Sequence, residues 1–140
     1  MSKIEGKGTA VLVEDNLMFG MMIEPTLRRL GYQVRTLAGG PMTAGQVAAL
    51  KPAIIFVNLA SSRCDGSAQV RALRGEEPLS ATPIIGYAGH VERHHFQAGR
   101  DAGATLVVPN SAMRKALPAV LEKLQHRLAG DQSEWPEDDD

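Results

Sequence analysis

The chain contains one cysteine, Cys64, so it can form no internal disulfide and no structural zinc site built from several cysteines. Aromatic residues make up only 4% of the chain, and its one tryptophan, Trp135, lies near the carboxyl end. No apolar run is long enough to span a bilayer, and the first residues lack the apolar core of a signal peptide. We therefore expect a cytoplasmic protein that makes no membrane contact.

Charge is distributed unevenly along the 140 residues, although the net charge is only −1. Residues 131–140 contain six of the 16 acidic side chains and no lysine or arginine, which leaves residues 1–130 with a net charge of +5. Because like charges repel and only Trp135 is strongly apolar there, we expect a disordered acidic tail at 131–140. Residues 8–130 are long enough for one globular domain, preceded by an extension at 1–7.

Short apolar runs alternate with longer amphipathic stretches through the predicted domain. This alternation predicts a parallel sheet with helices on both faces. Pro25 falls inside the first helix and predicts a kink near Met21 and Met22. The expected strands are 9–13, 32–37, 53–57, 83–87 and 104–108, and the expected helices are 17–30, 41–50, 67–74, 91–102 and 112–128.

Ligands of such sheets bind just beyond the carboxyl ends of the strands. The residues at these positions are Glu14 and Asp15 after the first strand, Asn58 after the third, Ala88 after the fourth and Asn110 after the fifth. An asparagine at a strand end is also common without any special function, because its side chain satisfies nearby backbone groups.

Four segments carry a resemblance to a known family. They are Val11–Asn16, Lys51–Leu59 followed by Asp65-Gly66, Thr82–Ile85, and Ala102–Ala104. In order and spacing the chain resembles the receiver domain of bacterial response regulators over residues 8–129. The resemblance implies a doubly wound, flavodoxin-like α/β fold with five parallel strands in the order 2-1-3-4-5.

The resemblance also implies where phosphoryl chemistry would take place. In the family, an aspartate at the position of Asn58 accepts a phosphoryl group from a histidine kinase with the help of Mg²⁺. Two acids hold the metal, and a Thr or Ser and a Lys contact the phosphate. Here Glu14 and Asp15 match the acids, whereas Ala88 and Asn110 replace the hydroxyl and the lysine. A shifted alignment puts Val108-Pro109 at the lysine position, and that alignment also lacks the cation.

A neutral amide is a far poorer phosphoryl nucleophile than a carboxylate. We therefore expect a pseudo-receiver, not an enzyme, that acts in signalling by protein–protein interaction without phosphorylation. Its partner would be a signalling protein or kinase rather than nucleic acid, and a homodimer is left open. The alternative is a small-ligand sensor that uses the altered pocket. We expect no cofactor beyond a weak Mg²⁺ site formed by Asp15, Asn58 and Ala60.

The family uses its fourth helix, fifth strand and fifth helix as an output surface. The residues that would form this surface here are Arg93, His94, Arg100, Val107, Arg114 and Lys115, with Val107 where the family often has a switching aromatic residue. Several of them are basic, so the surface suits an acidic protein partner. The acidic tail of the same chain or of another could compete for it.

Overall fold

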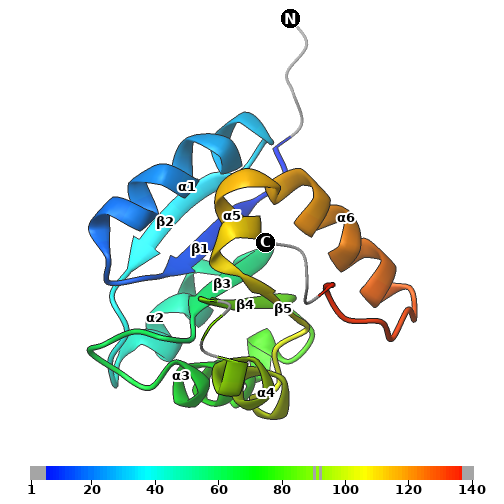
Figure 1. Ribbon diagram of the computed structural model, residues 1–140. Coiled ribbons are helices and arrows are strands. Elements are labelled where there is room, and N and C mark those ends of the chain that lie inside the picture. Colours follow the sequence, from blue (N-terminus) through cyan, green and yellow to red (C-terminus); the bar gives the residue numbers. More distant parts are fainter. Residues whose placement is uncertain (1–5, 90, 92, 137–140) are drawn as a thin grey trace, which may run out of the picture.

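The computed structural model describes residues 6–89, 91 and 93–136, which form a five-stranded parallel sheet with helices on both faces (Figure 1). The strand order is β2-β1-β3-β4-β5, which confirms the predicted fold. The strands are β1 (Thr9–Val13), β2 (Gln33–Leu37), β3 (Ile54–Asn58), β4 (Ile84–Ala88) and β5 (Leu106–Pro109). The helices are α1 (Leu17–Arg29), α2 (Thr43–Leu50), α3 (Gly66–Arg74), the short 3-10 helix η1 (Glu77–Leu79), α4 (Arg93–Ala102), α5 (Asn110–Lys115) and α6 (Leu117–Leu128).

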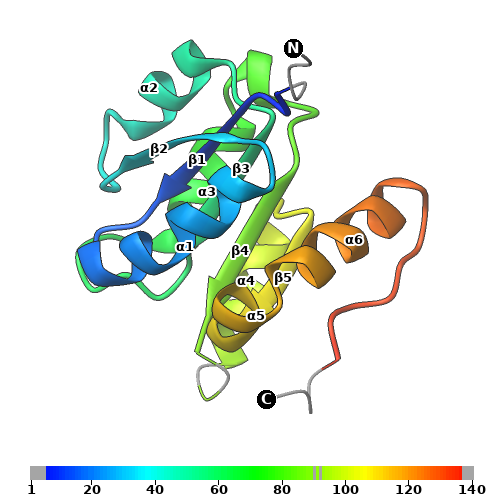
Figure 2. The same ribbon diagram turned by 90° about the horizontal axis from the view of Figure 1, so that it is seen from above.

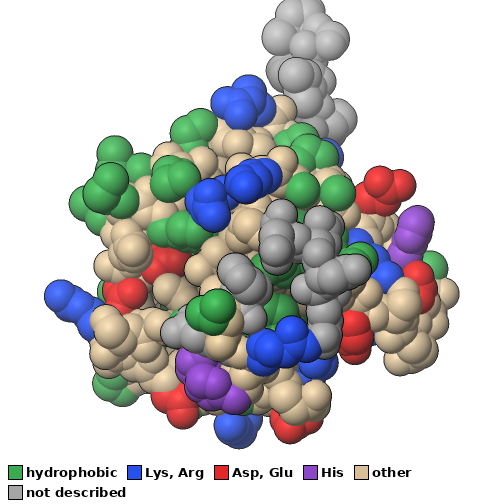
Figure 3. All heavy atoms as spheres, in the orientation of Figure 1, with side chains coloured by type: hydrophobic (Ala, Val, Ile, Leu, Met, Phe, Trp, Pro, Cys, Tyr) green, Lys and Arg blue, Asp and Glu red, His purple; other side chains and the backbone are tan. Residues whose placement is uncertain are grey.

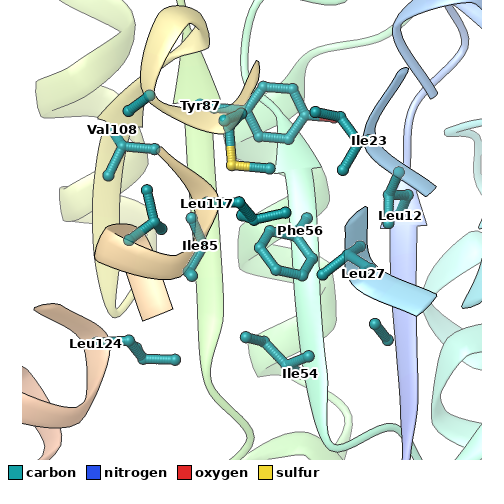
Figure 4. Close-up of a cluster of buried hydrophobic side chains, with 14 of the residues drawn as sticks. Leu12, Ile23, Leu27, Ile54, Phe56, Ile85, Tyr87, Val108, Leu117 and Leu124 are labelled. Atoms are coloured by element: carbon teal, nitrogen blue, oxygen red, sulfur yellow. The ribbon is translucent and has the colours of Figure 1, made fainter. Parts of the chain in front are cut away.

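Helices lie on both faces of the sheet (Figure 2), and an apolar cluster fills the space on each face. On one face, side chains of α1, α5 and α6 pack around Leu12, Phe56 and Tyr87, as Figure 4 shows. On the other face, α2, α3 and α4 pack against Val57 and neighbouring residues of the central strands. Because strands β1, β3 and β4 are covered on both sides, their sequences are apolar runs with little polar alternation. No helix in the described part of the chain is long and apolar enough to cross a membrane.

The carboxyl-terminal region contains two helices where the sequence predicted one at 112–128. The break falls at Ala116, whose backbone has φ −139° and ψ 35°, and α6 then begins with Pro118 in its first turn. Proline lacks an N–H group and fits the first turn of a helix better than its interior, so Pro118 favours a new helix here. Asn110 becomes the first residue of α5. Pro25, by contrast, lies inside a continuous α1.

The acidic tail also differs from the prediction. Residues 131–136 contact α4 and α6 through ion pairs of Asp131 and Glu134, and Trp135 packs against the apolar cluster beneath α6. The expected disorder was therefore wrong for 131–136, because Arg100 of α4 and the nearby Lys123 and Arg127 of α6 pair with these acids. The rest of the predicted tail, 137–140, lies outside the described residues, as do residues 1–5 of the predicted extension.

The Asp65-Gly66 pair fixes the start of α3 beside the end of β3. The Asp65 carboxylate accepts hydrogen bonds from the Ser67 hydroxyl and from the backbone N–H groups of Ser67 and Ala68, which keep the pKa of Asp65 below its ordinary value. A Cβ atom at Gly66 would lie 2.4 Å from the Leu59 Cα, so only glycine allows this close approach.

Arg74, at the end of α3, joins the α3–β4 and α4–β5 connections at the opposite end of the sheet from Asn58. Its guanidinium donates to the carbonyls of Leu79, Thr82 and Gly103 at 2.9, 2.6 and 2.9 Å, and to the Thr105 hydroxyl at 3.0 Å. Partial burial lowers the pKa of Arg74 below its ordinary value. One charged side chain therefore supplies the donors that four loop acceptors require.

We predict that Arg74→Met lowers the free energy of unfolding by about 2–4 kcal/mol, because it leaves these acceptors without their charged donor. The matched control is Arg71→Met on the same helix, where the arginine is exposed, and there the change should stay within about 0.5 kcal/mol. Urea unfolding measures both. Equal losses in the two variants would contradict the role assigned to Arg74.

Candidate functional site

The carboxyl ends of the central strands bring together residues that are far apart in the sequence. Val13 of β1 pairs with Val57 of β3, and Asn58 pairs with Tyr87 of β4. This register places Glu14 beside Asn58, as the strand-end argument predicted. Glu14 is only 4% exposed, which makes it the buried carboxylate of the site.

Three donors from three segments satisfy the Glu14 carboxylate. The Asn58 Nδ2 donates to Glu14 Oε2 at 2.8 Å, and the backbone N–H of Asn16 donates to the same oxygen at 2.9 Å. The Tyr87 hydroxyl donates to Oε1 at 2.7 Å. A buried charge is tolerated only when such hydrogen bonds replace water. The donors therefore occupy both oxygens of the acid.

Asn58 uses both ends of its amide. Its Oδ1 accepts a hydrogen bond from the Ala60 N–H at 2.8 Å, while its Nδ2 donates to Glu14. The first bond is the ordinary strand-end role of asparagine, and an aspartate could make it equally well. The second bond requires a donor, which an ionised aspartate lacks. The neighbouring carboxylate of Glu14 therefore favours an amide over a carboxylate at position 58.

Tyr87 is the site residue that the sequence reasoning missed. It is 1% exposed, and its ring stacks on Phe19 with the centroids 5.3 Å apart. Burial, reinforced by the charge of Glu14, raises the pKa of the Tyr87 hydroxyl well above its ordinary value. A tyrosine in an otherwise aliphatic buried strand was the available signal, because a buried hydroxyl needs a hydrogen-bond partner.

Asp15 lies outside this network and forms a different contact. Its Oδ2 accepts a hydrogen bond from the Ser61 hydroxyl at 2.6 Å. The oxygens proposed for Mg²⁺ on Asp15 and Asn58 thus already have donors, and the described residues include no group of three His, Cys, Asp or Glu side chains able to hold a metal. This set of side chains fits a divalent cation poorly.

A small cavity of about 60 Å³ lies over the network. Asn110 reaches it from α5 with its Oδ1 buried and without a hydrogen-bond partner among the described residues. Val108 instead belongs to the apolar core, and Pro109 pairs with Ala88 within the sheet. Ala88 is fully buried in the apolar cluster on the opposite face of the sheet. The cavity is lined by Glu14, Asn16, Phe19, Asn58, Tyr87 and Asn110.

Comparison with known proteins gave matches among solved structures only, since no family model and no curated protein matches the chain. A protein described as a response regulator from Chloroflexus aurantiacus J-10-fl is 22% identical, with a TM-score of 0.74 over 86% of this chain and 97% of its own. A response regulator receiver domain from Bermanella marisrubri is also 22% identical, with a TM-score of 0.72 over 86% and 99%.

A third match is the receiver domain of a sensor histidine kinase from Pseudomonas aeruginosa PAO1, whose structure has a magnesium ion coordinated in the active site cleft. It is 23% identical, with a TM-score of 0.71 over 87% of this chain and 98% of its own. The chain has the receiver-domain fold. Glu14 and Asp15 therefore follow the first strand of a receiver fold, Asn58 ends the third and Asn110 begins the helix after the fifth.

The residues predicted for the output surface of this receiver fold are only partly on a surface. Arg93 and His94 are exposed on α4, and Arg114 and Lys115 are exposed on α5. Val107 is completely buried within β5, so its assignment to a surface was wrong. It faces the apolar cluster beneath α4 because alternate residues of a strand point to opposite faces of the sheet. Arg100 of α4 contacts the acidic segment that follows α6.

We predict that Asn58→Asp destabilises the protein by about 2–3 kcal/mol at neutral pH, because a second carboxylate would face Glu14 without a donor. Repulsion raises the pKa of the introduced carboxyl in the folded state. The loss should be smallest at low pH, where this group is neutral in both states, and should grow as the pH rises above about 4, where the unfolded chain ionises first.

Thermal or urea unfolding between pH 3 and pH 8 checks this prediction, within the range in which the unaltered protein stays folded. Asn16→Asp is the matched control, since Asn16 is exposed and its side chain only accepts a hydrogen bond from the Phe19 N–H, as an aspartate can. A parallel loss in both variants, or a loss independent of pH, would refute the proposed conflict with Glu14.

We predict that Tyr87→Phe lowers the free energy of unfolding by about 1–3 kcal/mol, because it removes one donor to the buried Glu14 carboxylate. The raised pKa of Tyr87 adds a pH dependence. Stability of the unaltered protein falls as the pH rises through 10, where the unfolded tyrosine ionises, and this decline should weaken in the variant. Tyr32→Phe is the control; an equal destabilisation there would contradict the account.

Proposed function

We propose that this chain is a pseudo-receiver that acts in signalling through protein–protein contact and needs no phosphorylation. Its receiver fold supports a signalling role, and the proposal adds that position 58 is not a phosphoryl acceptor. We place the protein in the cytoplasm with a signalling protein or kinase as partner, and assign it no enzymatic activity.

The hydrogen bond from Asn58 Nδ2 to Glu14, at 2.8 Å, is the observation that carries the proposal. The amide nitrogen has no free electron pair to attack phosphorus, because that pair is delocalised into the carbonyl. The amide oxygen is neutral and already accepts the Ala60 N–H. The side chain is thus engaged at both ends in holding the loop and the acid.

Electrostatics at the cavity give independent support. Among the described residues, Glu14 is the one acidic side chain that lines the cavity, and no lysine or arginine is among the lining residues. A phosphoryl group placed there would meet a buried negative charge without a compensating cation, which is unfavourable in a medium of low polarity. Ala88, which is buried in the cluster on the other face of the sheet, offers no hydroxyl that could bind a phosphoryl group in place of a cation.

Magnesium is not required in this proposal. The magnesium ion is a feature of the P. aeruginosa receiver domain. Here an amide hydrogen points at Glu14, and Asp15 is bonded to Ser61. A cation would have to displace donors that already form hydrogen bonds with these carboxylates. We therefore expect millimolar Mg²⁺ to stabilise the protein little.

The volume of the cavity argues against the alternative of a small-ligand sensor. A cavity of about 60 Å³ has room for only a few water molecules. Pockets that bind metabolites are typically about 300–1,000 Å³. Protein contact is therefore the better proposal for this fold.

Incubation with acetyl phosphate and Mg²⁺, followed by intact-mass measurement, tests the proposal. We predict that the unaltered chain gains no phosphoryl group, because it lacks the acceptor, the hydroxyl and the cation. The matched positive control is the triple variant Asn58→Asp, Ala88→Thr, Asn110→Lys, which should gain a phosphoryl group if these positions account for the inactivity. A phosphorylated species of the unaltered chain in high yield would overturn the proposal.

A further inference from the structure

The segment that follows α6 turns back across the molecule and lies against α4 and α6 (Figure 1). Gly130 enables this reversal with φ +112°, a conformation that favours glycine. The Asp131 N–H then bonds the His126 carbonyl at 2.9 Å. Residues 131–136, here called the C-terminal segment, are therefore directed onto the surface by a defined turn.

Three basic side chains hold the acidic groups of the C-terminal segment. Glu134 lies 3.2 Å from Arg100 and 3.4 Å from Arg127, and Asp131 lies 3.6 Å from Lys123. The three bases, here called the α4–α6 surface, have side chains only 17–21% exposed, whereas the two acids are 38–40% exposed. With the segment docked, the three cations are thus more covered than the two acids that pair with them.

Arg127 is central to the α4–α6 surface. Its Nε donates to the Thr105 carbonyl at 3.1 Å, which anchors the guanidinium to the loop before β5. Its Nη1 donates to the backbone carbonyls of Gln132 and Ser133 at 2.9 and 3.2 Å. These contacts recognise backbone carbonyls as well as a carboxylate, as a peptide-binding arginine would.

Trp135 provides an apolar anchor beside the charged contacts. It is partly buried against the cluster formed by α1, α5 and α6, but its Nε1 is buried without a hydrogen-bond partner in the described part of the chain. A permanent part of a core rarely leaves an indole N–H unpaired. The indole therefore packs on the apolar cluster without a hydrogen bond to the described residues that would fix it there. In Figure 3, acidic and basic side chains lie side by side over α6.

We propose that the α4–α6 surface binds an acidic, aromatic-containing segment of a partner protein, and that residues 131–136 occupy the surface in cis until that partner displaces them. This inference rests on the proposed protein-binding function and specifies its surface. A short tether gives the C-terminal segment an effective concentration on the order of 1 mM, so a partner must bind with more contacts to replace it.

Trp135 is the only tryptophan in the chain, so its fluorescence reports docking of the C-terminal segment in the unaltered protein. We predict emission typical of a partly buried indole, with a shift to longer wavelength in Arg127→Ala, which loses the central donor. Arg71→Ala, an exposed arginine on α3, is the control and should leave the spectrum unchanged. Identical spectra in unaltered protein and Arg127→Ala would overturn the cis contact.

Binding in trans is tested with a labelled peptide, Asp-Gln-Ser-Glu-Trp-Pro, and the full chain carrying Glu134→Ala and Trp135→Ala to release its own segment. Fluorescence anisotropy should show at least tenfold tighter binding to this variant than to the unaltered chain. Adding Arg127→Ala should remove the gain, whereas adding Arg71→Ala should not. A peptide with Asn and Gln in place of the acids should bind at least tenfold more weakly.

Equal affinity for the released and unaltered chains, or no effect of Arg127→Ala, would overturn this inference. Neither result changes the outcome of the acetyl phosphate experiment, which tests phosphorylation-independence separately. Conversely, phosphorylation of the unaltered chain would overturn the proposed function without changing what the peptide binds.

Discussion

The buried carboxylate of Glu14 sets the constraint on which the whole site depends. A negative charge that is removed from water must receive hydrogen bonds, and here they come from the loop after β1, the end of β3 and β4. Asn58 and Tyr87 are therefore not independent features of two strands. They are the two side-chain donors that stabilise the buried carboxylate of Glu14. Together they connect the carboxyl ends of the three central strands.

This constraint explains why the substitutions at the site form a consistent set. In the proposed function, Asn58 and the other donors satisfy Glu14 without a metal ion, and the described lining of the cavity offers Asn110 rather than a cation to a phosphate. What is left at this end of the sheet is a small, closed hydrogen-bond network. We therefore propose that other molecules bind to the exposed surfaces. The α4–α6 surface already forms ion pairs with an acidic segment.

The fold could be predicted from sequence because its central strands are apolar runs separated by helical patterns, and the strand-end rule correctly placed Glu14 beside Asn58. Tyr87 had a signal as the one polar side chain of an otherwise apolar strand, but its partner Glu14 is 73 residues away and is brought to it only by the tertiary fold. The break before α6 had a visible signal in Pro118. The docked segment had a partial signal in the opposite charges of the tail and of the predicted output surface, but the meeting of Arg100 and Arg127 at Glu134 depends on the tertiary fold.

An exchange of the two interacting groups tests the central claim most directly. The double variant Glu14→Gln, Asn58→Asp keeps one carboxylate and one amide donor facing each other, with their positions reversed. If the pairing governs the site, urea unfolding at neutral pH should show that the double variant recovers most of the stability lost by Asn58→Asp alone. Losses from the two single variants that simply add in the double variant would contradict the account.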